Sequence, residues 1–276
     1  SMLNIALDVV LILWMGMGVE GAGIATMLSQ AFSATLCWLY IRRRLQILIP
    51  TGAEWEYHDN MTGHLLNSGV PMGLQFSITG IGIIMLQSAN NALGTTYVAA
   101  FTASMRIKYL FTCVFDNIGV AMATYCGQNV GARRPERIAQ GIRASLCIML
   151  VYSVLTFAAI FPFADDMMTL FVDGGERSIV TNAAMFMRIN NYFYPILGVL
   201  SIFRYSIQGM GYSNLSMMSG VMEMIARSGV SLWLVPTFHF LGVCFGDPLA
   251  WVAADLFLIP CYLFVYSRLR RKLAAA

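Results

Sequence analysis

The sequence predicts an all-α membrane protein, a polytopic transmembrane helix bundle of about eight spans. Hydrophobic residues make up 58% of its 276 residues, charged residues only 11%, and the mean hydropathy is +0.68. A soluble domain carries about 25% charged residues, so this composition indicates an integral membrane protein. The apolar runs are continuous rather than alternating with a period of two, which favours helices over membrane strands.

Two apolar runs between Gly69 and Ala132 are the clearest spans, and a short turn at residues 91–94 separates them. Each exceeds about 20 residues, the length at which a helix crosses a hydrocarbon core of about 30 Å. The other expected spans cover residues 2–17, 19–41, 138–163, 182–208, 215–240 and 248–267.

Lysine and arginine gather on one side of the expected bundle. They follow the second span, follow the fourth span and fill the C-terminal tail: Arg42, Arg43, Arg44, Arg133, Arg134, Arg137, Arg143, Arg268, Arg270, Arg271 and Lys272. The opposite side carries only Arg177. Because cytoplasmic loops are enriched in Lys and Arg, we expect a multi-pass protein of the cell (plasma) membrane with both termini in the cytoplasm.

One long polar connection, residues 42–64, divides the chain. A shift of the sequence by 224 residues brings Gly18 onto Gly242 and Arg44 onto Arg268, at matching places in two pairs of spans. We therefore expect residues 1–41 to be the last two helices of one lobe, 42–64 a cytoplasmic linker, and 65–276 a complete six-helix lobe. About four further spans would then precede this chain, in the repeated arrangement that transporters often use.

Short motifs, in a fixed order along the chain, resemble the second half of MATE (multidrug and toxic compound extrusion) transporters. They are Gly69-Val70-Pro71, Leu86-Gln87, Asn91, Leu93-Gly94, Val98-Ala99-Ala100-Phe101, Gly127-Gln128-Asn129-Val130-Gly131-Ala132, Gln208-Gly209-Met210-Gly211, Glu223 with Arg227, and Pro248-Leu249-Ala250-Trp251. The resemblance covers nearly the whole chain, although Phe115-Asp116 stands where relatives often have proline. It implies a twelve-helix, two-lobe fold, of which this chain is the C-terminal lobe plus the last two N-lobe helices. It also implies secondary active multidrug efflux, with organic cations exchanged for H⁺ or Na⁺ by alternating access.

Charged side chains inside the spans mark a candidate substrate and ion pathway, because a charge at the centre of a membrane helix costs about 2.5–3.5 kcal/mol. Glu223 and Arg227 lie four residues apart and share one helix face. Asp116 lies near the middle of another span, on a face near Lys108. Structural ion pairs, Glu223 with Arg227 and Asp116 with Lys108, are the competing explanation. A carboxylate without such a partner favours its neutral form, so Asp116 is the better candidate for proton coupling.

Polar stripes on the third and sixth spans extend this pathway. On the third span they are Gln75, Thr79, Gly82 and Asn90, and on the sixth Asn190, Tyr194, Ser201, Arg204 or Tyr205, and Gln208. We expect them to line a cavity, with polar contacts between helices as the alternative, and we expect Pro195 to kink the sixth span. The resemblance also implies a cation site on the third and sixth spans, yet neither contains Asp or Glu. The cation site of the family therefore cannot be assigned to matching residues of this chain. Asp116 and Glu223 are proposed in its place on their chemistry alone.

The six cysteines and three histidines form no metal or redox motif, so no cofactor is expected beyond the coupling ion. No catalytic signature such as HExxH or GxSxG is present, and we do not expect an enzyme. The expected partners are small organic cations, the lipid bilayer and the missing N-lobe helices, and the net charge of +3 gives no sign of nucleic-acid binding. Two alternatives stay open: a lipid-linked saccharide flippase of the same superfamily, and an inactive truncated transporter fragment.

Overall fold

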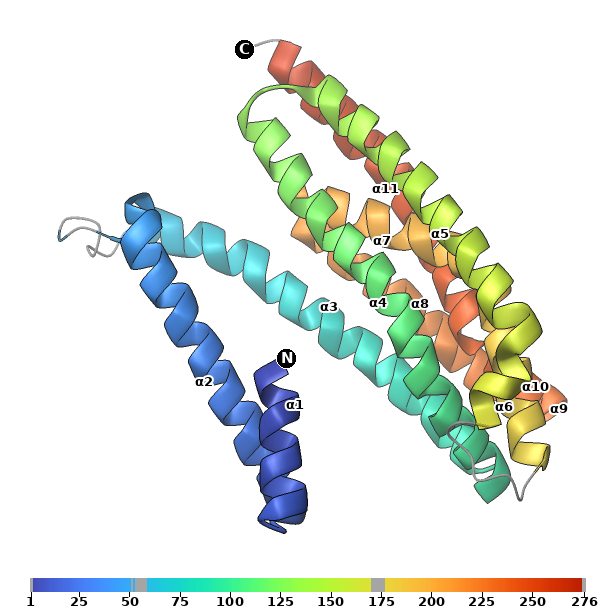
Figure 1. The fold of residues 1–276 in the computed structure, drawn as a ribbon. Helices are drawn as coiled ribbons and strands as arrows, with labels where there is room; N and C mark the ends of the chain where they lie inside the picture. The colour runs from blue at the N-terminus through green and yellow to red at the C-terminus, as the bar shows by residue number, and fades with distance from the viewer. Residues whose placement is uncertain (1, 51, 53–58, 170–176, 275–276) are drawn as a thin grey trace. The chain divides into compact units, whose positions relative to one another are not determined.

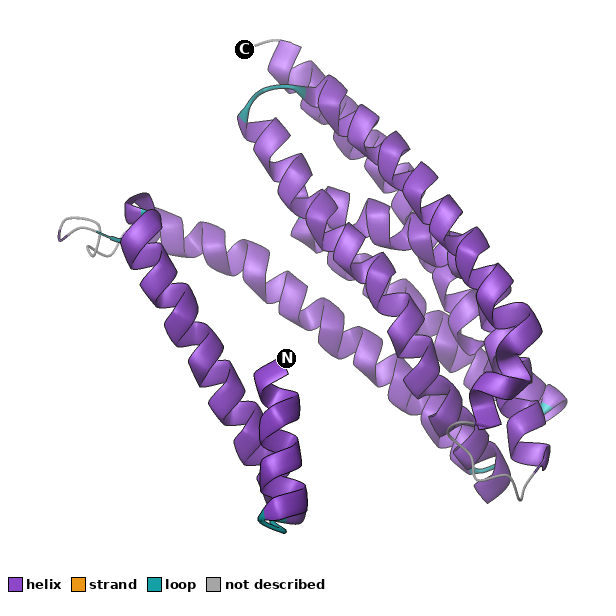
Figure 2. Ribbon diagram, in the orientation of Figure 1, coloured by secondary structure: helices purple, strands orange, loops and turns teal. Residues whose placement is uncertain are grey.

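The structure is a computed structural model that describes residues 2–50, 52, 59–169 and 177–274 (Figure 1). Within these ranges every regular element is a helix and none is a strand, as Figure 2 shows. The all-α expectation is therefore confirmed. Contacts divide the chain into two compact units, Ser1–Thr62 and Gly63–Ala276.

The first unit is a pair of helices packed against each other. Helix α1 (Met2–Asp8) continues as a π-helical segment (Val9–Trp14), and α2 (Gly18–Arg44) folds back along it. Gly18 has a φ of +57°, a backbone conformation that glycine adopts without steric cost. A 3₁₀ turn (Gln46–Leu48) follows α2. The pair corresponds to the first two expected spans, although the first is short.

The second unit is a bundle built on four long helices: α3 (Asp59–Asn91), α4 (Thr95–Gly131), α5 (Pro135–Thr169) and α11 (Gly246–Ala274). The turn between α3 and α4 falls at residues 92–94, as the sequence predicts. By length and composition, five of the described segments can cross a membrane: Gly18–Arg44, Met61–Asn91, Thr95–Gly131, Pro135–Thr169 and Phe240–Lys272. The other expected spans are shorter or interrupted, so the count of eight stays a prediction.

The sixth expected span is interrupted near its middle. It forms α6 (Arg177–Tyr192) and α7 (Tyr194–Gly209), which meet at Phe193. Pro195 lies in the first turn of α7, where its missing N–H and its ring prevent a continuous helix through this point. The expected kink is therefore a break between two helices.

The seventh expected span also changes geometry along its length. The segments after α7 are α8 (Ser213–Gly229), a π-helical segment (Val230–Leu234), α9 (Val235–Phe238) and α10 (Phe240–Cys244), followed by α11. His239, between α9 and α10, has a φ of +50°, which turns the chain sharply. Pro236 explains the π-helical turn before it, because proline cannot continue a regular hydrogen-bond ladder.

Helices α4 and α7 cross at close range because small residues meet at their contact. A Cβ atom at Gly209 would overlap the carbonyl oxygen of Ala123, and one at Gly119 would overlap the ring of Tyr205. Small residues let membrane helices approach until their backbones touch. This close crossing matters for the site, because α4 and α7 both contribute side chains to it.

The basic clusters of the second unit gather at one end of the bundle. The C-terminal end of α11 lies beside the turn between α4 and α5 (Figure 1). Arg133 in that turn has a φ of +55°, and Arg271 and Lys272 lie in the last turn of α11. This agrees with one side carrying both clusters, and the assignment of that side to the cytoplasm stays a prediction.

Candidate functional site

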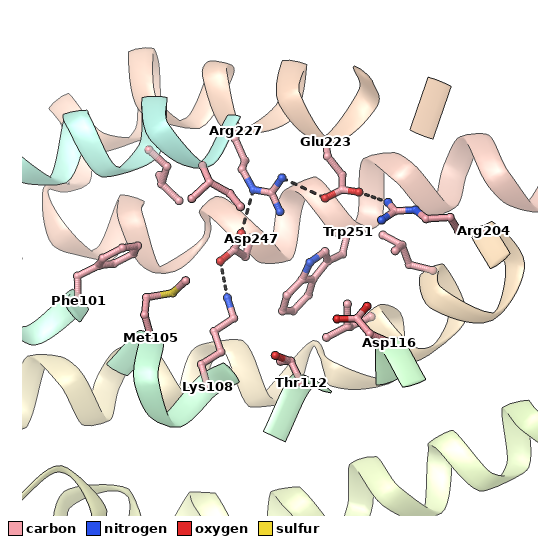
Figure 3. Close-up of a pocket in the computed structure, with 14 residues that line it drawn as sticks. Phe101, Met105, Lys108, Thr112, Asp116, Arg204, Glu223, Arg227, Asp247 and Trp251 are labelled. Carbon is pink, nitrogen blue, oxygen red and sulfur yellow. Dashed lines mark hydrogen bonds and ion pairs between the residues drawn. The ribbon is translucent and has the colours of Figure 1, made fainter. Parts of the chain in front are cut away.

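A cavity of about 210 Å³ lies inside the second unit, among α3, α4, α7, α8 and α11 (Figure 3). Its lining is half apolar and half polar or charged: Ile83, Leu86, Phe101, Met105, Lys108, Thr112, Asp116, Leu197, Leu200, Arg204, Glu223, Arg227, Asp247 and Trp251. Helix α4 supplies five of these side chains, at spacings of three or four residues. That spacing places them along one face of the helix.

Asp247 is the centre of the charged part of the cavity. Its Oδ2 is paired with the Nζ of Lys108, and its Oδ1 accepts a hydrogen bond of 2.9 Å from the Nε of Arg227. Lys108 also donates to the Oδ1 of Asn190 at 3.0 Å, and its Nζ lies 5.0 Å from the ring centroid of Trp251. Asp247 therefore links its own helix, α11, to α4 through Lys108 and to α8 through Arg227.

Glu223 continues the series of charges. Its Oε2 lies 3.0 Å from the Nη1 of Arg227, so the pair expected from the four-residue spacing is formed. Its Oε1 is paired with the Nη2 of Arg204, whose Nε donates to the Oγ of Ser219 at 3.1 Å. The resulting chain of alternating charges joins α4, α11, α8 and α7. Figure 3 shows its contacts as dashed lines.

We call this series the charge chain: Lys108, Asp247, Arg227, Glu223 and Arg204. Each carboxylate in it lies between two cations, and each of the five side chains is buried or nearly so. Removing one partner from a buried ion pair typically costs about 3–5 kcal/mol, because the other charge is left uncompensated. The charge chain thus holds α4, α7, α8 and α11 in place around the cavity.

Asp116 lines the same cavity but is not part of the charge chain. Among the described residues it has no hydrogen bond or ion pair, and Arg204 is the charged group that acts on it electrostatically. The expected alternative, a pair with Lys108, is wrong. The two residues are eight positions apart, about 12 Å along a helix axis, and Lys108 is occupied by Asp247.

Three of the eight predicted site residues, Asp116, Glu223 and Arg227, line the cavity. The other five do not: Gln75, Asn90, Asn190, Tyr194 and Gln208. Gln75 accepts a 2.9 Å hydrogen bond from Ser216, and Asn190 accepts one from Lys108. Such contacts between helices are the alternative that the sequence left open. A role for these five residues in the substrate and ion pathway stays a prediction.

Two acidic residues of α11 were not among the site residues predicted from the sequence. Asp247 is the hub of the charge chain, and Asp255 is buried two turns further along the same face. A usable signal was present, since Asp247, Trp251 and Asp255 recur every four residues in an apolar run. Asp247 was overlooked because it lies one position before the expected eighth span.

Metal binding finds no support in the part of the chain that the structure describes. No group of three His, Cys, Asp or Glu side chains in it is placed to hold a metal ion. The six cysteines are free thiols. The side chains that line the cavity offer ion pairing, hydrogen bonding and aromatic contact.

Fold and cavity together define a polytopic helical membrane protein with a charged cavity inside its second unit, the construction of a membrane transporter. The family model MatE matches residues 71–232, more than half of the chain. The chain belongs to the MatE family of transporters, so the resemblance seen in the sequence is confirmed.

Individual relatives agree with this assignment. Probable multidrug resistance proteins YpnP and YoeA of Bacillus subtilis are 25% and 23% identical over 79% and 97% of this chain, and 46% and 60% of their own lengths. An FAD transporter of Shewanella oneidensis is 22% identical over 74% of this chain and 45% of its own. The chain thus spans about half the length of these relatives.

Solved structures agree on the fold. An outward-facing multidrug resistance MATE family transporter matches 97% of this chain with a TM-score of 0.89 at 23% identity, over 60% of its own length. A MOP superfamily transporter from Pyrococcus furiosus, described as having a binding pocket of reverse polarity, matches 97% with a TM-score of 0.85 at 22% identity, over 60% of its own length.

Proposed function

We propose that the full-length protein is a secondary active multidrug exporter that exchanges organic cations for H⁺ or Na⁺ by alternating access. The observation that carries this is a charged cavity, lined by five helices of the bundle, in a chain of the MatE family. Two relatives carry multidrug resistance in their names, which supports the same substrate class. Intramembrane charges around a cavity are the usual mark of a substrate or ion pathway.

Within the cavity, Asp116 is the proposed contact for the cation or the proton. Glu223 and Asp247 are each neutralised by two basic side chains, so neither offers uncompensated negative charge. Asp116 has no ion-pair partner among the described residues and faces the same space. One carboxylate that binds either a proton or an organic cation couples the two by competition.

Aromatic side chains complete the proposed contact for a lipophilic cation. Phe101 and Trp251 line the cavity with Met105 beside them (Figure 3). A cation over an aromatic face gains about 0.5–2 kcal/mol, and methionine adapts to ligands of different shape. A cavity of about 210 Å³ is smaller than the roughly 300–1,000 Å³ of drug sites, so it would hold only part of such a molecule.

The arrangement of the whole protein belongs to the same proposal. Residues 1–41 would be the last helices of an N-lobe, 42–64 a cytoplasmic linker and 65–276 the C-lobe, in a multi-pass protein of the cell membrane with cytoplasmic termini. Part of the linker, residues 53–58, lies outside the described residues. The chain's coverage of only about half to three fifths of its relatives is consistent with upstream N-lobe helices.

The proposal is tested with the full-length protein in proteoliposomes, by efflux of a fluorescent lipophilic cation under imposed H⁺ or Na⁺ gradients. We expect Asp116→Asn to abolish the dependence of efflux on pH. Glu223→Gln should lower the rate but keep that dependence, because Glu223 acts by pairing. The same dependence on pH in wild type and Asp116→Asn would return Asp116 to a structural role. No efflux under either gradient would refute the exporter.

One observation favours a second candidate, a flippase for lipid-linked saccharides with an anionic phosphate group. Lys108, Arg204 and Arg227 all line the cavity, and basic side chains are what phosphate groups bind. The relative named as an FAD transporter is in keeping with other substrate classes in the family. Flipping of a fluorescent lipid diphosphate in the same proteoliposomes, without cation efflux, would favour this candidate over drug export.

A further inference from the structure

Asp255 is a buried carboxylate that the proposed drug and ion site does not use. It lies on α11, one turn beyond Trp251 of the cavity wall, and only 7% of the residue is exposed. Its Oδ1 is fully buried without a hydrogen-bond partner, and no ion pair joins Asp255 to any other described residue. A functional or structural reason is needed for such a group at this depth.

The burial of Asp255 argues that it is neutral in this structure. An isolated ionised carboxylate in an apolar interior is so costly that the group takes up a proton instead. Asp247 provides the matched comparison on the same helix, since it is 6% exposed and remains tolerable as an anion beside Lys108 and Arg227. Nearly equal burial with opposite pairing therefore favours the charged form at Asp247 and the neutral form at Asp255.

Arg204 links Asp255 to the cavity. It is the charged side chain that interacts electrostatically with Asp255, and it also lines the cavity. In the structure its guanidinium is engaged by Glu223 and Ser219. Arg204 also interacts electrostatically with Asp116. The guanidinium therefore interacts with three carboxyl groups, those of Asp116 on α4, Glu223 on α8 and Asp255 on α11.

We propose that Asp255 is a proton-binding site of the transporter, protonated while Arg204 is paired with Glu223 and ionised when Arg204 turns toward it. On release the O–H bond of the carboxyl group breaks, the proton passes to water, and Arg204 compensates the carboxylate that is left. Because Arg204 lines the cavity, proton occupancy of Asp255 changes the charge that a ligand meets. This inference rests on the proposed transport function only for its role in coupling.

The other charged groups near Asp255 do not offer it a partner. The elements packed against α11, and α11 itself, carry these other charged residues: Glu223 and Arg227 on α8, Glu136, Arg137, Arg143, Asp165 and Asp166 on α5, and Asp247, Arg268, Arg270, Arg271 and Lys272 on α11. None of them acts electrostatically on Asp255 as Arg204 does. Arg227 is held by Glu223 and Asp247, and Arg143 acts on Tyr262, two turns beyond Asp255. Segments α10 and η4 (Val230–Leu234) contribute no charged side chain. Arg204 is therefore the group whose movement can stabilise an ionised Asp255.

The test is infrared difference spectroscopy of the purified full-length protein in nanodiscs, titrated from acid to alkaline pH without any drug. We expect a protonated-carboxyl C=O band that is lost in Asp255→Asn, retained in the control variant Asp165→Asn at an exposed ion pair, and restored at a shifted frequency in Asp255→Glu. In Arg204→Gln the band should persist to higher pH, since the cation that compensates the carboxylate is gone. An unchanged band in Asp255→Asn overturns the proposal.

A transport arm separates this inference from the proposed function. If Asp255→Asn removes the band and flattens the pH dependence of cation efflux, the proton site and its coupling both stand. If the band depends on Asp255 but wild-type protein exports no cation, the proton site stands and the exporter fails. If the wild-type protein exports the cation but the infrared band is unchanged in Asp255→Asn, the exporter proposal is supported and the proton-site proposal is refuted.

Discussion

Asp247 and Asp255 lie two turns apart on the same face of α11, and their exposed fractions are nearly equal. Their electrostatic surroundings are opposite. Asp247 is met by a lysine from α4 and an arginine from α8, and it joins three helices. Asp255 has no ion pair or hydrogen bond within the described chain. Burial alone therefore does not assign a role to an intramembrane carboxylate, since the cations on neighbouring helices decide whether it is structural or titratable.

The largest expected effect comes from removing the charge of Asp247, the paired carboxylate of the two. Asp247→Asn leaves Lys108 and Arg227 sharing less negative charge, and we expect it to lower the free energy of unfolding by about 3–5 kcal/mol. Denaturant unfolding of the full-length protein in mixed micelles measures this. The double variant with Lys108→Met should recover part of the loss, because Arg227 still has Glu223. A loss below about 1 kcal/mol would mean that the charge chain does not hold the helices.

The next effect concerns the close crossing of α4 and α7. This crossing sets the distance between Asp116, on α4, and Arg204, on α7, the arginine that also acts on Asp255. Gly209→Ala puts a methyl group against the backbone of Ala123 and must push α7 away from α4. Overpacking of this kind costs about 1–3 kcal/mol, which the same unfolding measurement would show. Gly211→Ala, at a site with no neighbouring atom but a φ of +89°, is a control for backbone strain without overlap. Equal losses in both would argue against a tight crossing of α4 and α7.

A smaller effect on the free energy of unfolding is expected for Asp255, the carboxylate without an ion pair. Asp255→Leu replaces a neutral buried group by an apolar side chain of similar size, so the change in unfolding free energy should stay below about 1.5 kcal/mol. Asp247→Leu in parallel should cost several times more. If both leucine variants lose the same stability, Asp255 is ionised and paired, and the contrast between the two residues disappears.

The smallest effect is expected at the exposed pair Arg188–Asp165, whose side chains are 33% and 50% exposed. Such pairs typically contribute about 0.2–1 kcal/mol, so Asp165→Asn should be nearly neutral in the unfolding assay. Added salt should reduce even this difference, because an exposed pair is screened. A loss as large as that of Asp247→Asn would show that burial is not what gives the charge chain its strength.

Features that depend on spacing along one segment were predictable from the sequence. Membrane helices followed from continuous apolar runs, the turn before Thr95 from Asn91-Ala92-Leu93-Gly94, and the break in the sixth span from Pro195. The Glu223–Arg227 pair was predictable for the same reason, since residues four apart on a helix are neighbours. Ordered motifs also sufficed to place the chain in its family.

Which charged side chains meet depends on how the helices pack, and the sequence did not reveal it. Lys108 and Asp247 are 139 residues apart, and a lysine that shares a helix face with Asp116 is drawn instead to another helix. Of the polar side chains on the sixth expected span, Arg204 lines the cavity, whereas Asn190 accepts a hydrogen bond from Lys108. Asp247 and Asp255 look alike in sequence, both acidic, both in one apolar run and both on one face. Packing of α4 and α8 brings cations to the first alone, and Coulomb attraction acts through space, not along the chain.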